Sequence, residues 1–216
     1  MQGNNPKQIL IIDYTFHNSY DVAMSRPREF DYDTVLHTAI DIFREYGYNA
    51  SSYDILTKGT KLNKQSLYGA FGDKKALFNK SLSLYNADFL ERFQQLLSHG
   101  TTALETLRYW QLHFLPSRRE HNYGCLIVNS ALELQNSESS NVKIEFNLMC
   151  QQMKEMLEAV IAKGQQEGSV TLKLSSDQIS AHLVNTIIGL RVMVRSGAPN
   201  EQLQSQLDTA IELLLI

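Results

Sequence analysis

Residues 63–78 read Asn-Lys-Gln-Ser-Leu-Tyr-Gly-Ala-Phe-Gly-Asp-Lys-Lys-Ala-Leu-Phe. Asn63 is of a type that commonly precedes the first turn of a helix, and Leu67 and Phe71 follow one turn apart on one face. A glycine then breaks the pattern, and Asp73 is the next N-cap candidate, ahead of a longer apolar periodicity. The stretch therefore predicts a short helix followed directly by a long one.

Another short helix precedes this stretch. Ser51 or Ser52 can cap its N-terminus, and Leu56 is its inward-facing residue. Only Thr60 to Leu62 separate it from the helix that begins after Asn63. Two short helices joined by so tight a turn predict a helix–turn–helix unit.

The helix–turn–helix unit contains no acidic residue between Asp54 and Asp73. It carries side chains of the types that contact the phosphates and base edges of DNA. These side chains are Lys58, Lys61, Lys64, Gln65, Ser66 and Tyr68. The alternative interpretation is a solvated helix that happens to lack acidic residues.

Two further groups of basic residues favour DNA. Lys74 and Lys75 stand in the first turn of a predicted helix, where they oppose its macrodipole at a cost of roughly 0.3–1 kcal/mol each. A bound phosphate would reverse the sign of that interaction. Arg26 and Arg28 lie just before the first predicted helix, and a short basic arm there can enter a minor groove. The alternative for the arm is a solubilising terminus.

The rest of the chain is expected to be helical as well. From residue 31 onward apolar residues recur at helical spacing, and no strand pattern or internal repeat is evident. We predict an all-α fold of about nine helices. Its expected parts are a tail over residues 1–24, a three-helix DNA-binding domain over residues 25–78, and a helical ligand-binding and dimerisation domain over residues 79–216. Translation from Met24 is an alternative explanation of the polar tail.

The composition is typical of a globular protein. The 216 residues carry a net charge of −3, with 43% hydrophobic and 20% charged residues. The longest apolar run, Ile9 to Ile12, is too short for a transmembrane helix or a secretory signal. Two cysteines are too few for a disulfide framework. We therefore expect a cytoplasmic protein without membrane association.

Residues 26–80 resemble the DNA-binding domain of TetR-type (tetracycline-repressor-like) transcriptional regulators. The likeness rests above all on residues 63–78, and also on Arg-Pro-Arg-Glu-Phe at 26–30 and the pattern Ala39, Phe43, Gly47-Tyr48, Ser51-Ser52. Residues 123–131, Tyr-Gly-Cys-Leu-Ile-Val-Asn-Ser-Ala, resemble a segment common in one branch. The remainder is similar in length and helix content to the family's ligand-binding domain.

The resemblance implies roles for the matching positions. Lys64, Gln65, Ser66 and Tyr68 would lie on a recognition helix in the major groove, while Lys74 and Ser51 or Ser52 would hold phosphates. With Lys61 and the arm, the predicted DNA-binding set is Arg26, Arg28, Ser51, Ser52, Lys61, Lys64, Gln65, Ser66, Tyr68 and Lys74.

Lys61 departs from the family pattern, which usually has glycine at this position of the turn. A left-handed conformation costs a residue other than glycine about 1–2 kcal/mol. Either the turn differs in this chain, or Lys61 tolerates the strain and adds a contact to the DNA backbone.

No catalytic or metal-binding pattern is present. The sequence lacks a glycine-rich phosphate loop, a nucleophile elbow and an H-E-x-x-H motif, so we expect neither an enzyme nor a cofactor. The spacing of His113, His121 and Cys125 matches no zinc site, and Pro116 interrupts the helix between them. Cys125 precedes the apolar residues 126–128 and is expected to be buried and inert, with a redox sensor as the alternative.

Bulky, adaptable side chains in the second half could line an apolar pocket, as the resemblance implies, although core packing explains each of them singly. These ligand-binding candidates are Tyr109, Trp110, His113, Phe114, Cys125, Phe146, Met149 and Met153. The predicted helix over residues 177–195 is apolar on more than one side, which leaves a face for a second subunit. The dimer-interface candidates are Leu183, Ile187, Leu190, Val194, Leu207 and Ile211.

These patterns together predict a transcriptional repressor. It would bind double-stranded operator DNA as a homodimer and be released by a small, largely apolar ligand. The alternative is an all-helical ligand-binding or protein-interaction module without DNA-binding activity. The acid-free stretch with Lys64, Gln65, Tyr68 and Lys74 favours the regulator, because an interaction module would not need it.

Overall fold

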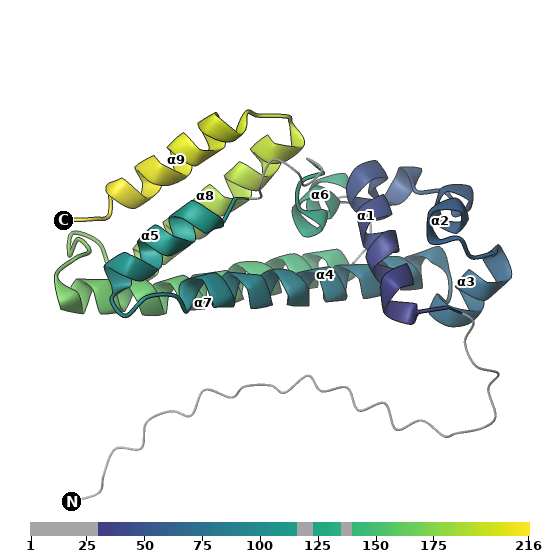
Figure 1. Ribbon diagram of the computed structural model, residues 1–216, viewed down its shortest axis with the longest axis horizontal. Coiled ribbons are helices and arrows are strands. Elements are labelled where there is room, and N and C mark those ends of the chain that lie inside the picture. Colours follow the sequence, from purple (N-terminus) through teal and green to yellow (C-terminus); the bar gives the residue numbers. More distant parts are fainter. Residues whose placement is uncertain (1–29, 116–122, 135–139) are drawn as a thin grey trace, which may run out of the picture. The chain divides into compact units, whose positions relative to one another are not determined.

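The computed structural model describes residues 30–115, 123–134 and 140–216. Over these ranges the chain forms nine α-helices and no strand, which confirms the predicted all-α fold (Figure 1). The helices are α1 (Tyr32–Ala50), α2 (Tyr53–Thr60), α3 (Lys64–Phe71), α4 (Lys74–Leu97), α5 (Ala103–His113), α6 (Leu126–Glu133), α7 (Ser140–Glu167), α8 (Ser176–Arg195) and α9 (Asn200–Glu212). Of the helices described, none is long and apolar enough to cross a membrane.

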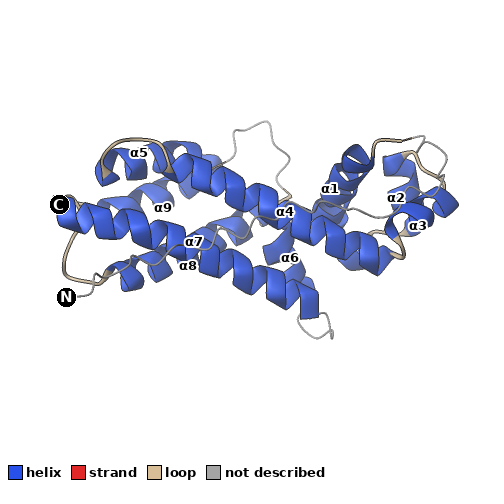
Figure 2. Ribbon diagram, turned by 90° about the horizontal axis from the view of Figure 1, so that it is seen from below, coloured by secondary structure: helices blue, strands red, loops and turns tan. Residues whose placement is uncertain are grey.

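Residues 32–216 form one compact unit that α4 runs through. Helices α1 and α3 contact α4, and α2 contacts both α1 and α3. Helices α5, α6 and α7 also contact α4, while α8 packs on α7 and α9 packs on α5 and α8. Figure 2 shows α1–α3 together at one end of α4 and α5 at the other. The domain boundary predicted after residue 78 falls inside α4 and stays a prediction, and the predicted tail over residues 1–24 lies outside the described ranges.

Aromatic packing fixes α3 and α4 against α1. Phe43 of α1 and Phe78 of α4 are buried and meet edge to face, with ring centres 5.0 Å apart. Phe71 of α3 is buried as well. Gly59 lets α2 approach α1 closely, because a Cβ there would lie 2.5 Å from Cδ1 of Ile42. This core holds the helix–turn–helix unit in place.

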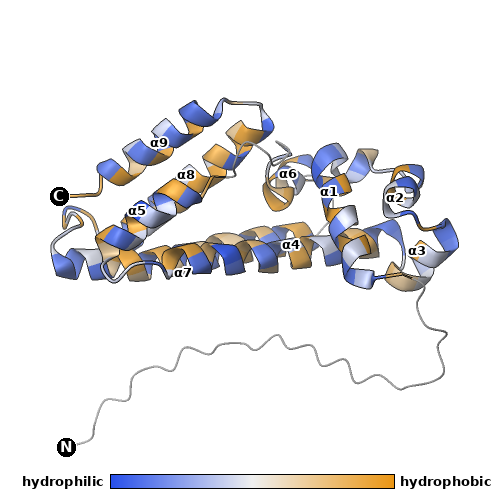
Figure 3. Ribbon diagram, in the orientation of Figure 1, coloured by the Kyte–Doolittle hydropathy of each residue, from blue (hydrophilic) through white to orange (hydrophobic). Residues whose placement is uncertain are grey.

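A second core lies among α4, α5 and the long helices α7 and α8. Trp110 is fully buried and meets Phe93 edge to face, with ring centres 5.9 Å apart. Met149 and Met153 of α7 are buried too. Figure 3 shows apolar residues prominent along α8 and hydrophilic residues along α9. The apolar periodicity of the second half thus builds a core of ordinary packed helices.

Polar side chains cap the helices at the predicted starts. Ser52, Asn63 and Asp73 each accept a hydrogen bond from the backbone N–H three residues further on. Thr102 does the same for α5 and forms a capping box with Glu105. These caps satisfy N–H groups that have no partner within the helix, and the first three confirm the predicted starts of α2, α3 and α4.

Gly47 interrupts α1 without ending it, although the sequence predicts that a glycine at this position stops the first helix. Gly47 has φ 79° and ψ 172°, a conformation that favours glycine, and helical structure continues to Ala50. The carboxylate of Glu133 in α6 accepts hydrogen bonds from the backbone N–H groups of Tyr48 at 2.9 Å and Asn49 at 2.7 Å. Those two donors are thereby satisfied beyond the kink, so the last turn persists.

Candidate nucleic-acid interface

The turn between α2 and α3 is left-handed at Lys61. The residue has φ 58° and ψ 20°, and it is the one residue other than glycine with positive φ in the described ranges. The sequence left open whether the turn differs in this chain or whether Lys61 tolerates the strain. The second alternative is correct. The Lys61 side chain is exposed, and its contact with a DNA backbone stays a prediction.

The predicted recognition helix is α3, and its polar side chains reach solvent. Lys64 and Gln65 are exposed, Ser66 and Tyr68 are half-buried, and Leu67 is buried in the core. The first turn of α3 contains no acidic residue. The helix N-terminus and Lys64 are both positive, which suits a polyanion.

Tyr53 joins α2, α3 and α4, and sequence reasoning missed it. Its ring lies 5.0 Å from the ring of Tyr68, and its hydroxyl accepts a 3.1 Å hydrogen bond from the backbone N–H of Lys74. Nζ of Lys64 lies 4.9 Å from the Tyr53 ring centre. A hydrogen bond with Tyr53 raises the pKa of Tyr68 to about 12.

Lys74 is positioned at the N-terminus of α4 by its own contacts. Its Nζ donates a 3.3 Å hydrogen bond to the Asn49 carbonyl and lies 4.6 Å from the Tyr48 ring centre. Burial lowers the pKa of Lys74. An ammonium group has three donors, so two remain for an anion at the start of the helix. Lys75 next to it is exposed.

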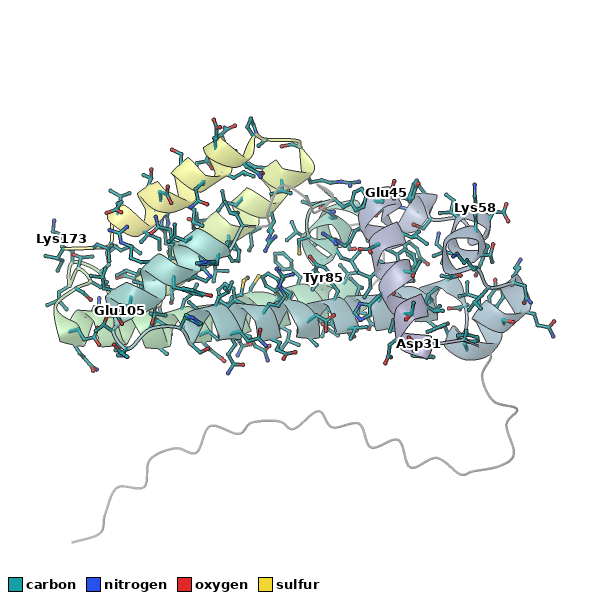
Figure 4. The ribbon with its side chains drawn as sticks, viewed as in Figure 1. Asp31, Glu45, Lys58, Tyr85, Glu105 and Lys173 are labelled. Carbon is teal, nitrogen blue, oxygen red and sulfur yellow. The ribbon has the colours of Figure 1, made fainter. Side chains whose placement is uncertain are left out.

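The remaining predicted DNA-binding residues differ in how far they are exposed to solvent. Ser51 is buried, and its hydroxyl donates to the Gly47 carbonyl, whereas Ser52 is exposed at the start of α2. Of that pair, Ser52 is therefore the one that a phosphate can reach. Arg26 and Arg28 lie outside the described residues. Figure 4 shows Lys58 on α2, near the same end of α4.

The predicted ligand-binding residues mostly belong to the packed core. Trp110, Cys125, Met149 and Met153 are buried, Phe146 is half-buried, and Tyr109 stacks on the exposed ring of His113. Of the eight candidates, Phe114 lines a cavity of about 460 Å³, and the other seven do not. Helical periodicity identifies inward-facing side chains but does not tell a cavity wall from a filled interior.

The cavity lies mainly between α1 and α4, with one residue from α8. Its lining residues are His37, Ile40, Asp41, Arg44, Tyr85, Asp88, Phe89, Arg92, Phe93, Leu96, Phe114, Tyr123 and Arg191. Figure 4 shows Tyr85 on α4, in the stretch of this helix that faces α6. Sequence reasoning missed the charged half of this wall, because its residues come from segments far apart in the chain.

The predicted dimer-interface residues face the chain's own core. The six residues, all buried in a single chain, are Leu183, Ile187, Leu190, Val194, Leu207 and Ile211. Within one chain these side chains are already covered, and their contact with a second subunit stays a prediction. Their apolar periodicity correctly indicates burial, but the neighbour that covers them lies in the same chain.

Comparison with known proteins agrees with the geometry of α1–α4. Residues 35–80 match the model of the family "bacterial regulatory proteins, tetR family". The chain is 26% identical to the HTH-type transcriptional regulator YezE of Bacillus subtilis, over 88% of this chain and 100% of YezE. It is 22% identical to the HTH-type transcriptional repressor ComR of Escherichia coli, over 88% of this chain and 92% of ComR.

A solved structure supports the same assignment. The TetR-family regulator CifR, in a complex with 26-bp double-strand operator DNA, superposes with a TM-score of 0.74. The two chains are 26% identical, and the match covers 87% of this chain and 98% of CifR. The residues that match the family model, 35–80, include the helix–turn–helix unit with its lysines and its acid-free stretch. Residues 35–80 thus match the DNA-binding domain of the TetR family, and over most of its length the chain is similar to TetR-family transcriptional regulators.

Proposed function

We propose that this regulator is a repressor, that it binds a near-palindromic operator as a homodimer, and that a small molecule in the cavity releases it. The likeness to ComR, a repressor, and to CifR, bound to operator DNA, supports the repressor role and the binding of an operator. Release by a small molecule is supported by the cavity, because its wall belongs mainly to α1 and α4, which also hold the DNA-binding surface.

The observation that carries the proposal is that the cavity is lined by the helices that hold the DNA surface. Arg44 and Asp41 belong to α1, which packs against α2 and α4. Tyr85 and Phe89 belong to α4, whose first residue, Lys74, lies at the predicted phosphate contact. A ligand that moved either helix would therefore change the position of α3. If the ligand bound one position of these helices more tightly than the other by about 1–3 kcal/mol, operator affinity would change 5–150-fold.

Hydrogen bonds also join α1 to the ligand-binding half. Arg44 donates to the Gly124 carbonyl at 3.3 Å from Nε and 3.2 Å from Nη2. Arg195 of α8 donates from Nη1 to the Arg44 carbonyl at 3.1 Å and from Nη2 to the Glu45 carbonyl at 3.0 Å. Arg44 also lines the cavity, so a ligand that displaces its side chain would disturb the contacts that hold α1.

The exposed side of α8 supports a homodimer. Val192 is 39% exposed, and a Cβ at Gly189 would meet nothing within 4 Å, so a second helix can approach closely here. Leu213, just after α9, is 74% exposed. Sedimentation at micromolar concentration should show a dimer for the wild type and a monomer for Gly189→Arg. A monomeric wild type would contradict the proposed assembly.

Selection from a random duplex pool tests the proposed operator. We expect an enriched site with two symmetric half-sites about one helical turn apart or a multiple of it, roughly 34–36 Å. Affinity for that site should fall steeply as salt is raised, because lysines displace counterions from phosphates. Failure to enrich any sequence would favour the interaction module instead.

A further inference from the structure

We propose that the cavity binds a carboxylate with an apolar body, and that the guanidinium of Arg191 holds the carboxylate group. This inference rests on the proposed function, because it names the chemical class of the ligand that would control DNA binding. Three features of the cavity favour such a ligand: Arg191 itself, the charges around it, and the apolar part of the wall.

Arg191 has hydrogen-bond donors without an acceptor. Its Nε is buried and has no partner, and no ion pair involving Arg191 occurs in the described part of the chain. Its Cζ lies 4.8 Å from the ring centre of Phe114 and 5.4 Å from that of Phe89. Aromatic rings interact with the face of a guanidinium, so the N–H groups at its edge stay available. A planar carboxylate matches that edge with two parallel hydrogen bonds.

The acidic residues of the wall already have other partners. Oδ1 of Asp41 lies 3.2 Å from Nη1 of Arg44, and Oδ2 of Asp88 lies 3.9 Å from Nδ1 of His37. With three arginines against two aspartates, the wall has an excess of positive charge that one carboxylate would neutralise. A phosphate dianion fits less well, because the same two aspartates would repel its second charge.

The rest of the wall is suited to an apolar body and to a second hydrogen bond. Ile40, Phe93 and Leu96 line the cavity, whose volume of about 460 Å³ is in the range of small-molecule sites. Tyr85 also lines the cavity, and its phenolic hydroxyl is of a type that can donate to a carboxylate oxygen. Sequence reasoning predicted a largely apolar ligand, and the charged part of the wall adds the acid group.

Calorimetric titration of the full chain with matched compounds tests the proposal. The probes are butyrate, octanoate, benzoate and 4-phenylbutyrate, each compared with its primary amide, which keeps the shape and removes the charge. We expect at least one carboxylate to bind at least about tenfold more tightly than its amide, as charge-assisted hydrogen bonds allow. If no carboxylate is preferred to its amide, or if phenyl phosphate binds better than every carboxylate, the proposal is wrong.

Three variants assign the preference to Arg191. Arg191→Met should bring the carboxylate and the amide within about twofold, and Arg191→Lys should keep only part of the preference, because lysine lacks the planar fork. The matched control is Arg92→Met, which removes the same charge from an exposed position of the same wall. Thermal melting confirms that each variant is folded. If Arg92→Met and Arg191→Met lost the preference for carboxylates equally, the net charge of the wall and not Arg191 would explain it, and the assignment would be wrong.

Operator binding without ligand separates this proposal from the proposed function. If the wild type binds its selected operator but shows no preference for carboxylates, only the ligand class is wrong. If the wild type binds no operator, the repressor proposal fails, while a carboxylate preference lost in Arg191→Met would still establish the anion site.

Discussion

Replacing Lys61 by glycine should stabilise the fold and weaken DNA binding at the same time. Lys61 has φ 58° at the turn between α2 and α3, a left-handed conformation that costs a side chain about 1–2 kcal/mol. Glycine removes this strain but is more flexible in the unfolded chain, which costs about 0.5–1 kcal/mol. We therefore expect the free energy of unfolding to rise by about 0.5–1 kcal/mol, or the melting temperature by about 1–4 °C.

The loss in DNA binding comes from the exposed ammonium of Lys61. If that group contacts a phosphate, Lys61→Gly should reduce the slope of log affinity against log salt by about 1 per protomer. Sequence preference should not change, because a phosphate contact carries no base information.

The matched control is Lys61→Ala, which removes the charge but keeps a Cβ in the left-handed conformation. Urea unfolding measures stability, and fluorescence anisotropy with a labelled operator measures affinity over a salt series. Both variants should lose the same DNA affinity, but only Lys61→Gly should gain stability. If Lys61→Ala is as stable as Lys61→Gly, the strain argument is wrong. If neither variant changes the salt slope, the backbone contact is wrong.

Three further predictions concern the contacts that hold the fold and the interface. Tyr53→Phe removes the acceptor for the backbone N–H of Lys74, so the free energy of unfolding should fall by about 1 kcal/mol and operator affinity should fall with it; unchanged values of both would refute the link. Glu133→Ala should lower the free energy of unfolding by about 1–2 kcal/mol, because two backbone N–H groups of α1 lose a charged acceptor, and an unchanged urea midpoint would count against this. Backbone hydrogen bonds from Thr101 and Thr102 hold the pKa of Glu105 below its ordinary value of 4.5, so its contribution to stability is present above about pH 4.5 and is lost as pH falls through the lower folded value. The difference in melting temperature between wild type and Glu105→Gln should therefore shrink on acidification, and a difference that stays constant with pH would contradict the assignment.

Local features of this fold could be predicted from the sequence. The caps Ser52, Asn63 and Asp73 bond backbone groups three residues away, so the spacing alone identifies them. The strained turn is one of two possibilities that the sequence allows, because Lys61 stands where a left-handed residue is expected. Gly47 is recognisable as a break in the first helix, but the sequence could not show that Glu133 sustains another turn beyond it.

Long-range features could not be predicted in the same way. Apolar periodicity indicates that Ile187 and its neighbours on α8 are buried, yet it cannot distinguish burial in the chain's own core from burial against a partner. Trp110, a ligand-binding candidate, packs against Phe93, and periodicity alone cannot tell whether such a residue borders a cavity or fills the interior. Nothing in the sequence singles out Arg191, because its surroundings depend on Phe89 and Phe114, which lie far from it along the chain.

Parallel selection of DNA sites tests most directly whether α3 reads the bases. The experiment compares the wild type with Gln65→Ala on α3 and with the control Gln95→Ala, which changes an exposed glutamine near the other end of α4. We expect the wild type and Gln95→Ala to enrich the same symmetric site, and Gln65→Ala to enrich a site with altered or relaxed bases in each half. An identical site for all three proteins would contradict base recognition through Gln65, and the absence of any enriched site for the wild type would contradict sequence-specific DNA binding itself.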